Sequence, residues 1–228
     1  MAAMEGDGRR HEHQARIFLR PVGSALPLGF FAFGIGMLLL GCLGIGWIPV
    51  DEQKDVGMIL IAFVFPLELL ATVFAFLARD TLGATTLGLF TTSWLAFGWL
   101  DFASQPGSTS VTVGIYQFGF ATAVLLLAAM STLGKPFFSV LLVGSAARMV
   151  ASGYFEIGGS EQSFKIAGGI GIGLAALALY GGTALGLEDA RRRQVLPLFR
   201  RGAADEAFDG FEAQLARLES EPGVRQQL

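Results

Sequence analysis

Hydrophobic and polar positions divide the chain into a long apolar middle and two polar ends. The first apolar run has no charged residue over about 23 positions, where roughly 20 are enough for a helix to cross the hydrocarbon core. Five similar runs follow, separated by short polar stretches. The six segments are Leu26–Ile48, about Gly57–Ala78, about Leu82–Leu100, about Val113–Leu133, about Pro136–Phe155 and about Phe164–Leu187. This pattern predicts an all-α membrane protein with a bundle of six transmembrane helices.

The apolar runs do not fit a β-barrel, because they lack the alternation of polar and apolar positions that barrel strands show. A helix satisfies its backbone hydrogen bonds internally, as a lipid environment demands. Proline stands just inside the start of two segments, at Pro27 and Pro136, where a missing N–H costs least. The connections at residues 79–81 and 134–135 are very short. The helices they join are therefore predicted to be antiparallel neighbours.

Lysine and arginine are distributed unevenly between the two sides of the predicted bundle. With the N-terminus in the cytoplasm, only Lys54 and Lys165 face outward. The basic residues that then face inward are Arg9, Arg10, Arg16, Arg20, Arg79, Lys135, Arg191, Arg192, Arg193, Arg200 and Arg201. The positive-inside rule thus predicts that both termini are cytoplasmic, in the inner (plasma) membrane.

Composition agrees with a polytopic membrane protein: 53% of the 228 residues are hydrophobic, 15% are charged and the mean hydropathy is +0.57. We expect a polar N-terminal tail at 1–23, a transmembrane domain at 24–198 and a cytoplasmic tail at 199–228. The last tail carries apolar residues at helical spacing, which predict a short amphipathic helix that packs on protein rather than on lipid. These residues are Phe208, Phe211, Leu215 and Leu218.

No residue pattern indicates a metal, a cofactor, a nucleic acid or an enzymatic reaction. Cys42 is the only cysteine, so no intrachain disulfide or cysteine zinc site can form. His11 and His13 lie in the polar tail, where we expect them to be solvated. The glycine run 168–173 resembles a phosphate-binding loop, but it lies inside an apolar segment without a preceding soluble strand.

Two ionisable residues inside the apolar segments are the main candidates for function, because such residues are costly in a membrane. Glu68 lies near the centre of the second segment. Arg148 lies in the fifth, and Ser145 and Ser152 share its helix face. This stripe could replace the water around a carboxylate, and a protonatable Glu68 could supply a proton-coupled step. Alternatively, Glu68 and Arg148 form a structural ion pair, or Arg148 reaches to the outer interface.

The third segment carries a second polar stripe, with Thr81, Thr85 and Thr92 at helical spacing. These threonines could line a route, although threonines in membrane helices often bond only to their own backbone. The tryptophans Trp47, Trp94 and Trp99 partly fit an interfacial belt.

Glycine is frequent, with 31 residues, and forms small-xxx-small steps in the sixth segment. One step is Gly169 with Gly173, and another is Gly182 with Gly186. Such surfaces let membrane helices approach closely, either within one subunit or between subunits.

Motifs along about Ser24–Leu198 resemble the acetate/succinate transporter family of the SatP or YaaH type, also called AceTr. The family's Asn-Pro-Ala-Pro-Leu-Gly-Leu opening is matched by Pro27-Leu28-Gly29, followed by Phe33-Gly34. Its second-to-third helix motifs are matched in order by the stretch 79–94. Its Gly-Val-Tyr is matched by Gly114-Ile115-Tyr116, and its closing Val-Leu-Pro by Val195-Leu196-Pro197.

The resemblance implies a cyclic homo-hexamer in which each protomer holds an anion pathway with a hydrophobic neck. The family's neck residues, a Phe and a Tyr, fall on Phe33 and Phe90. Its opening Asn falls on Ser24, and its helix-two Gln falls on Glu68. The asparagines late in the family's first helix are replaced by glycine here, at Gly41 and Gly44.

Together these observations predict a membrane transporter or channel for small carboxylates, acetate first and succinate second, whose flux could be coupled to protons. The predicted pathway residues are Ser24, Phe33, Glu68, Thr81, Thr85, Phe90, Thr92 and Arg148. One alternative is a structural or accessory membrane subunit that keeps the fold without transport. Another is a channel for a different small solute, such as ammonium or a neutral acid.

Overall fold

A computed structural model describes residues 23–191 and 193–200 of the chain. Within these ranges every regular element is a helix. The elements are α1 (Leu26–Ile45), η1 (Val50–Glu52), α2 (Gln53–Ile59), η2 (Leu60–Val64), α3 (Phe65–Leu77), α4 (Thr81–Ala103), α5 (Val111–Ser131), α6 (Pro136–Gly158) and α7 (Glu161–Arg191). The predicted all-α fold is confirmed over the described residues, while residues 1–22 and 201–228 of the predicted tails, with the predicted amphipathic helix, lie outside them.

Five helical stretches of the described chain are long and apolar enough to cross a membrane. They are Leu26–Ile45, Val50–Leu77, Val111–Ser131, Pro136–Gly158 and Glu161–Arg191. The sixth long helix, α4, has 23 residues. At 1.5 Å per residue it is about 34 Å long, enough for a hydrocarbon core of roughly 30 Å. The chain is therefore a multi-pass membrane protein built on the predicted segments, and the cytoplasmic placement of its termini stays a prediction.

Several helix boundaries differ by a few residues from those that the apolar pattern predicts, and the start of the second crossing differs most. The second crossing begins at Val50 rather than near Gly57, because its first turns carry charged residues that hydropathy reads as a loop. The first helix ends at Ile45 rather than Ile48. Gly46 takes a left-handed conformation with φ 81° and ends the helix there.

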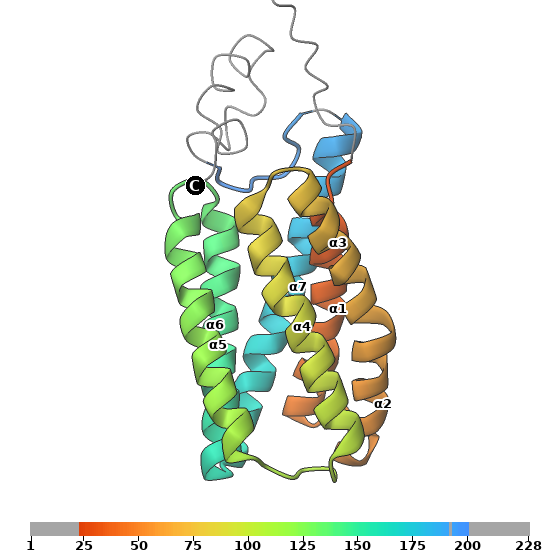
Figure 1. Cartoon of the computed structure of the whole chain (residues 1–228), viewed down its shortest axis with the longest axis vertical. Coiled ribbons are helices and arrows are strands. Elements are labelled where there is room, and N and C mark those ends of the chain that lie inside the picture. Colours follow the sequence, from red (N-terminus) through yellow and green to blue (C-terminus); the bar gives the residue numbers. More distant parts are fainter. Residues whose placement is uncertain (1–22, 192, 201–228) are drawn as a thin grey trace, which may run out of the picture.

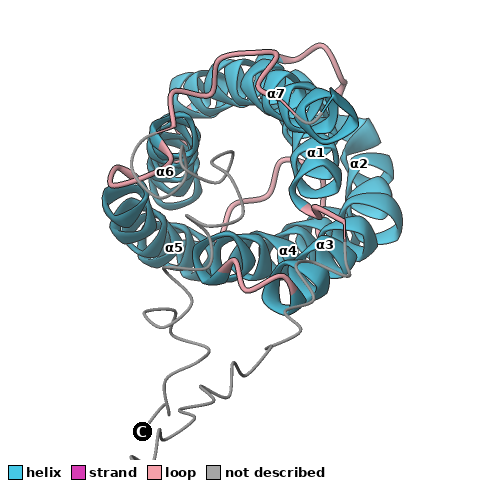
Figure 2. Cartoon of the chain, turned by 90° about the horizontal axis from the view of Figure 1, so that it is seen from above, coloured by secondary structure: helices cyan, strands magenta, loops and turns pink. Residues whose placement is uncertain are grey.

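The helices stand side by side around a common axis and form a ring when seen from above (Figure 2). Around the ring, α1 packs on α7, α7 on α6, and α6 on α5, while α4 packs on α2 and α3. The end of the bundle that holds residue 23, the turns at 78–80 and 132–135, and residues 193–200 is called the terminal end (Figure 1). The opposite end, with residues 46–49 and 104–110, is called the loop end.

Glycines allow α1 and α7 to touch through their backbones. A Cβ on Gly44 would lie 2.7 Å from the Cα of Gly168, and one on Gly41 would lie 2.9 Å from the backbone nitrogen of Ile172. Any side chain at these positions would push the helices apart. The two positions that carry asparagine in the family pattern are therefore glycine in this chain, at the backbone contact between α1 and α7.

The predicted small-xxx-small steps of α7 divide into packed and open positions. Gly182 packs against Phe30 and Phe31 of α1, where a Cβ would come within 3.3 Å. Gly169, Gly173 and Gly186 have no such neighbour within 4 Å in the described protomer. Only part of the glycine pattern is thus explained by packing within one subunit.

A π-helical turn precedes the buried glutamate of α3. The N–H of Phe65 bonds to the carbonyl of Leu60, five residues back. Pro66 follows and has no N–H of its own, and in a regular helix its ring would collide with the carbonyl four residues earlier. The wider π turn accommodates this mismatch, and such turns often occur at functional sites. It leaves Glu68, in the first turn of α3, inside the bundle.

Candidate functional site

Four aromatic rings from three helices meet inside the bundle. They are Phe33 of α1, Phe90 and Trp94 of α4, and Phe120 of α5, and we call them the aromatic cluster. The ring centroids of Phe33 and Phe90 are 5.1 Å apart, those of Phe33 and Trp94 5.7 Å, and those of Phe90 and Phe120 5.2 Å. All three pairs are edge-to-face, a favoured arrangement of aromatic rings. The cluster joins α1, α4 and α5 by a dry aromatic layer.

The two predicted neck residues, Phe33 and Phe90, are thus in contact, but their partners were not predicted. Trp94 was expected at a membrane interface, and this is wrong because it is 1% exposed. Trp47 and Trp99 are exposed. The spacing of four between Phe90 and Trp94 places them on one helix face, a signal that could have identified Trp94. The position of Phe120 depends on how α5 meets α4, which no local pattern encodes.

Glu68 is fully buried beside this cluster, with 0% exposure. One of its carboxyl oxygens, Oε2, accepts a hydrogen bond of 2.8 Å from the indole N–H of Trp94. The other, Oε1, has no hydrogen-bond partner. The ion pair between Glu68 and Arg148, which was one of the alternatives from the sequence, is absent from the described protomer. Glu68 is therefore held by an aromatic ring of the cluster and has one free oxygen.

The buried hydroxyls near Glu68 are not those predicted from the threonine stripe. The Thr72 hydroxyl donates to the Glu68 carbonyl at 2.8 Å and lies 3.1 Å from the Thr91 hydroxyl. The predicted residues Thr81, Thr85 and Thr92 are exposed on the outer side of α4. Helical spacing correctly places these three on one face, but the structure does not bring that face to the aromatic cluster.

Arg148 of α6 is also inside the bundle, with 6% exposure. Its Nε has no hydrogen-bond partner. Ser145 and Ser152 are buried on the same helix, as predicted, although the Ser145 hydroxyl donates to its own helix at the Leu141 carbonyl. Gly171 of α7 faces the guanidinium, and a Cβ there would lie 3.3 Å from Nε. Arg148 therefore lies against α7 rather than reaching to the interface.

Further polar side chains, which the sequence did not single out, lie between Arg148 and the loop end. Asp101 of α4 interacts electrostatically with Arg148 and with Glu156 of α6. The side-chain N–H of Gln53 donates to Asp101 at 2.9 Å. Gln117 of α5 is buried with an unpartnered Oε1. Each lies on a different element, so sequence spacing could not group them.

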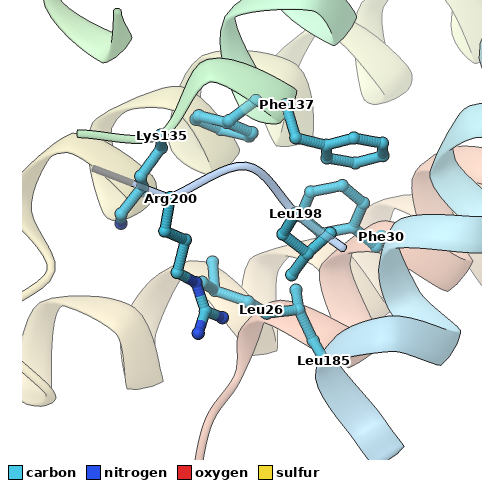
Figure 3. Close-up of a pocket in the computed structure, with 9 residues that line it drawn as sticks. Leu26, Phe30, Lys135, Phe137, Leu185, Leu198 and Arg200 are labelled. Atoms are coloured by element: carbon cyan, nitrogen blue, oxygen red, sulfur yellow. The ribbon is translucent and has the colours of Figure 1, made fainter. Parts of the chain in front are cut away.

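At the terminal end a pocket opens inside the ring, with apolar walls and two cations (Figure 3). Its lining residues are Leu26, Phe30, Gly83, Lys135, Phe137, Phe138, Leu185, Leu198 and Arg200. The predicted pathway residue Ser24 lies exposed at this end, before the start of α1. Phe30 also stacks on Phe137 and tilts against Phe138, which ties α1 to α6.

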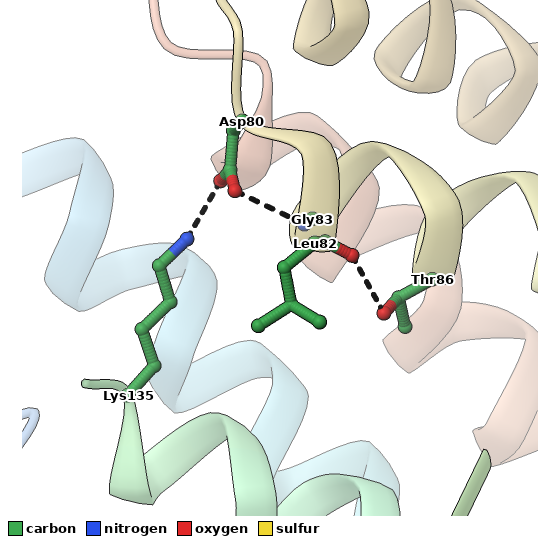
Figure 4. Close-up of polar contacts among 5 residues, drawn as sticks. All are labelled: Asp80, Leu82, Gly83, Thr86 and Lys135. Carbon is green, nitrogen blue, oxygen red and sulfur yellow. Dashed lines mark hydrogen bonds and ion pairs between the residues drawn. The ribbon is translucent and has the colours of Figure 1, made fainter. Parts of the chain in front are cut away.

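Both cations of this pocket are matched by carboxylates. The ammonium of Lys135 lies 2.7 Å from Asp80 Oδ2, and the pair joins the turn before α4 to the turn before α6 (Figure 4). Asp80 also caps α4, because its Oδ1 accepts from the Gly83 N–H at 3.0 Å. Arg200 pairs with Glu188 of α7.

No group of three or more potential metal ligands occurs among the described residues. The predicted solvated histidines, His11 and His13, lie outside them.

The chain is similar to known proteins in both sequence and fold. The GPR1/FUN34/yaaH family model matches residues 8–197. An uncharacterized protein from Methanothermobacter thermautotrophicus is 24% identical over 186 residues, which cover 75% of this chain and 88% of that protein. The structure of the bacterial acetate channel SatP superposes with a TM-score of 0.71 at 19% identity, over 78% of this chain and 99% of that one. The likeness to SatP shows the fold.

Proposed function

Because the chain belongs to the GPR1/FUN34/yaaH family, we propose that it conducts small carboxylate anions across a membrane, acetate first and succinate second. The main observation behind this proposal is that Arg148 is buried with an unpartnered Nε, inside the same bundle as the aromatic cluster. The shared fold with an acetate channel supports the same function. The proposed route runs along the ring axis between the terminal end and the loop end.

The proposed neck of this route is the contact between Phe33 and Phe90. An edge-to-face pair at 5.1 Å leaves no space between the rings, so passage requires a ring to rotate. The family pattern has a tyrosine where this chain has Phe90, and loss of the hydroxyl makes the neck drier. A dry constriction favours small solutes with an apolar methyl end over strongly hydrated ions.

Arg148 is the proposed attraction point for the anion. A buried guanidinium is costly unless its N–H donors are hydrogen-bonded, because these bonds must replace the ones it made to water. A carboxylate beside Arg148 would accept the unmet N–H of Nε through a charge-assisted hydrogen bond. This chemistry selects an anion over a neutral or cationic solute.

Glu68 is the proposed proton-holding group. It is buried with one tryptophan N–H and no counter-charge in the described protomer. Its partner Trp94 contacts Phe33 in the proposed neck. Loss or gain of a proton at Glu68 would therefore change the charge directly beside the neck, which supports coupling of anion flux to protons.

We further propose that the protein is a homo-hexamer of the plasma membrane in which each protomer has its own route. The open glycines Gly169 and Gly173 on the outer side of α7 support packing between copies, because small residues let membrane helices approach closely. Native mass spectrometry in mild detergent measures this, and a monomer under conditions that preserve the fold would contradict it.

Uptake of labelled acetate into proteoliposomes tests the proposed function. Uptake should rise with an inward proton gradient. Phe33→Ala should widen the neck and favour succinate relative to acetate. Arg148→Gln should lower uptake of both. Leu38→Ala, at an exposed position of α1, is the matched control and should change neither.

The decisive negative result is the absence of uptake for every two- to four-carbon carboxylate, with correctly oriented protein confirmed by protease protection. Unchanged flux in Phe33→Ala and Phe90→Ala would likewise reject the neck.

A further inference from the structure

The segment that follows α7 folds back across the terminal end of the bundle. The hydroxyl of Tyr180 donates to the carbonyl of Pro197 at 3.0 Å. Arg200 pairs with Glu188, and Glu188 is buried. Both attachments reach back to α7, the helix that the segment continues. Residues 193–200, which we call the strap, are therefore fastened to α7 at two points.

One residue of the strap enters the bundle. Leu198 is 5% exposed and lies in the terminal-end pocket between Phe30, Phe137 and Leu185 (Figure 3). Its neighbour Phe199 is 65% exposed, and Val195 and Leu196 are only partly buried, so Leu198 is the most deeply buried apolar side chain of the strap.

The pocket that Leu198 helps to line lies inside the ring at its terminal end. Its walls come from α1, α4, α6 and α7, which include helices on opposite sides of the ring (Figure 2). Phe30 lies about one helical turn from Phe33, and both are buried. Leu198, Phe30 and the Phe33–Phe90 contact thus follow one another from the terminal end inward. A plug at this place closes the route before the neck.

We propose that the strap is a lid over the terminal-end mouth of the route, with Leu198 as its plug. The inference rests on the proposed function, since the mouth is that of the proposed route. The lid opens by lifting residues 193–200 away from the ring. Because Tyr180 and Glu188 both lie on α7, release of these two attachments needs no change in the packing of the other helices.

The strength of closure follows from the plug. Burial of a leucine side chain favours the closed state by roughly tenfold to a hundredfold in population. The Tyr180–Pro197 hydrogen bond adds a smaller factor, about twofold to tenfold. Loss of the plug should therefore open the mouth more than loss of this fastener.

Thiol labelling tests the lid without relying on transport. In a Cys42→Ser background, Leu185→Cys places a reporter in the pocket wall. A membrane-impermeant, charged thiol reagent should label it at least about tenfold faster when Leu198→Ala is added. Phe199→Ala, the matched control in the same strap, should leave the rate unchanged. Tyr180→Phe removes only the hydroxyl donor, keeps the pocket intact and should give a smaller increase.

Acetate uptake is measured on the same proteins. Faster labelling together with faster uptake in Leu198→Ala supports the lid. Faster labelling without uptake in any variant supports the lid and rejects carboxylate transport. Equal labelling of the parent, Leu198→Ala and Tyr180→Phe proteins, each monodisperse by gel filtration, would overturn the lid whatever the uptake.

Discussion

Replacing Trp94 by phenylalanine would remove the hydrogen-bond donor that holds Glu68. Glu68 is fully buried, so water cannot replace the lost indole N–H. The carboxyl would then have neither oxygen bonded, which costs about 1–3 kcal/mol for a buried polar group. The smaller ring adds a cavity cost of about 1 kcal/mol or more. We expect Trp94→Phe to lower the free energy of unfolding by about 2–4 kcal/mol.

The matched control is Trp99→Phe in the same helix, where the side chain is 60% exposed. It should change the free energy of unfolding by less than about 0.5 kcal/mol. Unfolding is followed by far-UV circular dichroism during titration with sodium dodecyl sulfate in mixed micelles. The double variant Glu68→Leu with Trp94→Phe should be more stable than Trp94→Phe alone, because replacing both partners leaves no unsatisfied group. Equal stability of the Trp94 and Trp99 variants, or additive losses in the double variant, would refute the reasoning.

Three further predictions concern the anion site and the helix contacts. Arg148→Gln should lower carboxylate flux into proteoliposomes by about tenfold or more, because the charge-assisted hydrogen bonds are lost, and undiminished flux would contradict this. Asp101→Asn should raise the apparent affinity for carboxylate and slow the maximal flux in the same assay, because it removes the negative charge that interacts with Arg148; a weaker affinity would argue against this effect of Asp101. Gly44→Ala should lower the free energy of unfolding by about 1–3 kcal/mol through overpacking, whereas Gly119→Ala, with open space around it in α5, should not lower it by overpacking; equal losses would contradict the α1–α7 contact.

The order of helices follows from hydropathy because each crossing requires a continuous apolar run. The pattern locates all six segments and misplaces the start of the second, where charged residues occupy helical turns at the loop end. Glycines at Gly41 and Gly44 predict close packing, and the structure shows their partner to be α7. The sequence alone could not name that partner.

The interior polar groups were harder to predict than the helices. Periodicity shows that Thr81, Thr85 and Thr92 share a face, but in a membrane both lipid-facing and core-facing residues are apolar, so polarity contrast does not orient α4. Glu68 and Arg148 could be identified because charge is rare in the apolar segments. Their partners could not be identified in this way. Trp94 lies 26 positions from Glu68 in the sequence, and Asp101 lies 47 positions from Arg148.

The position of Asp101 explains how a buried arginine could pass an anion on rather than trap it. An isolated guanidinium in a low-dielectric interior would hold a carboxylate tightly, whereas conduction requires binding weak enough to leave. Asp101 interacts electrostatically with Arg148 but forms no ion pair with it in the described protomer. Gln53 donates to Asp101 at 2.9 Å and so satisfies part of that carboxylate from the other side. We infer that Asp101 offsets the charge of Arg148 while leaving Nε free for the carboxylate of a passing substrate.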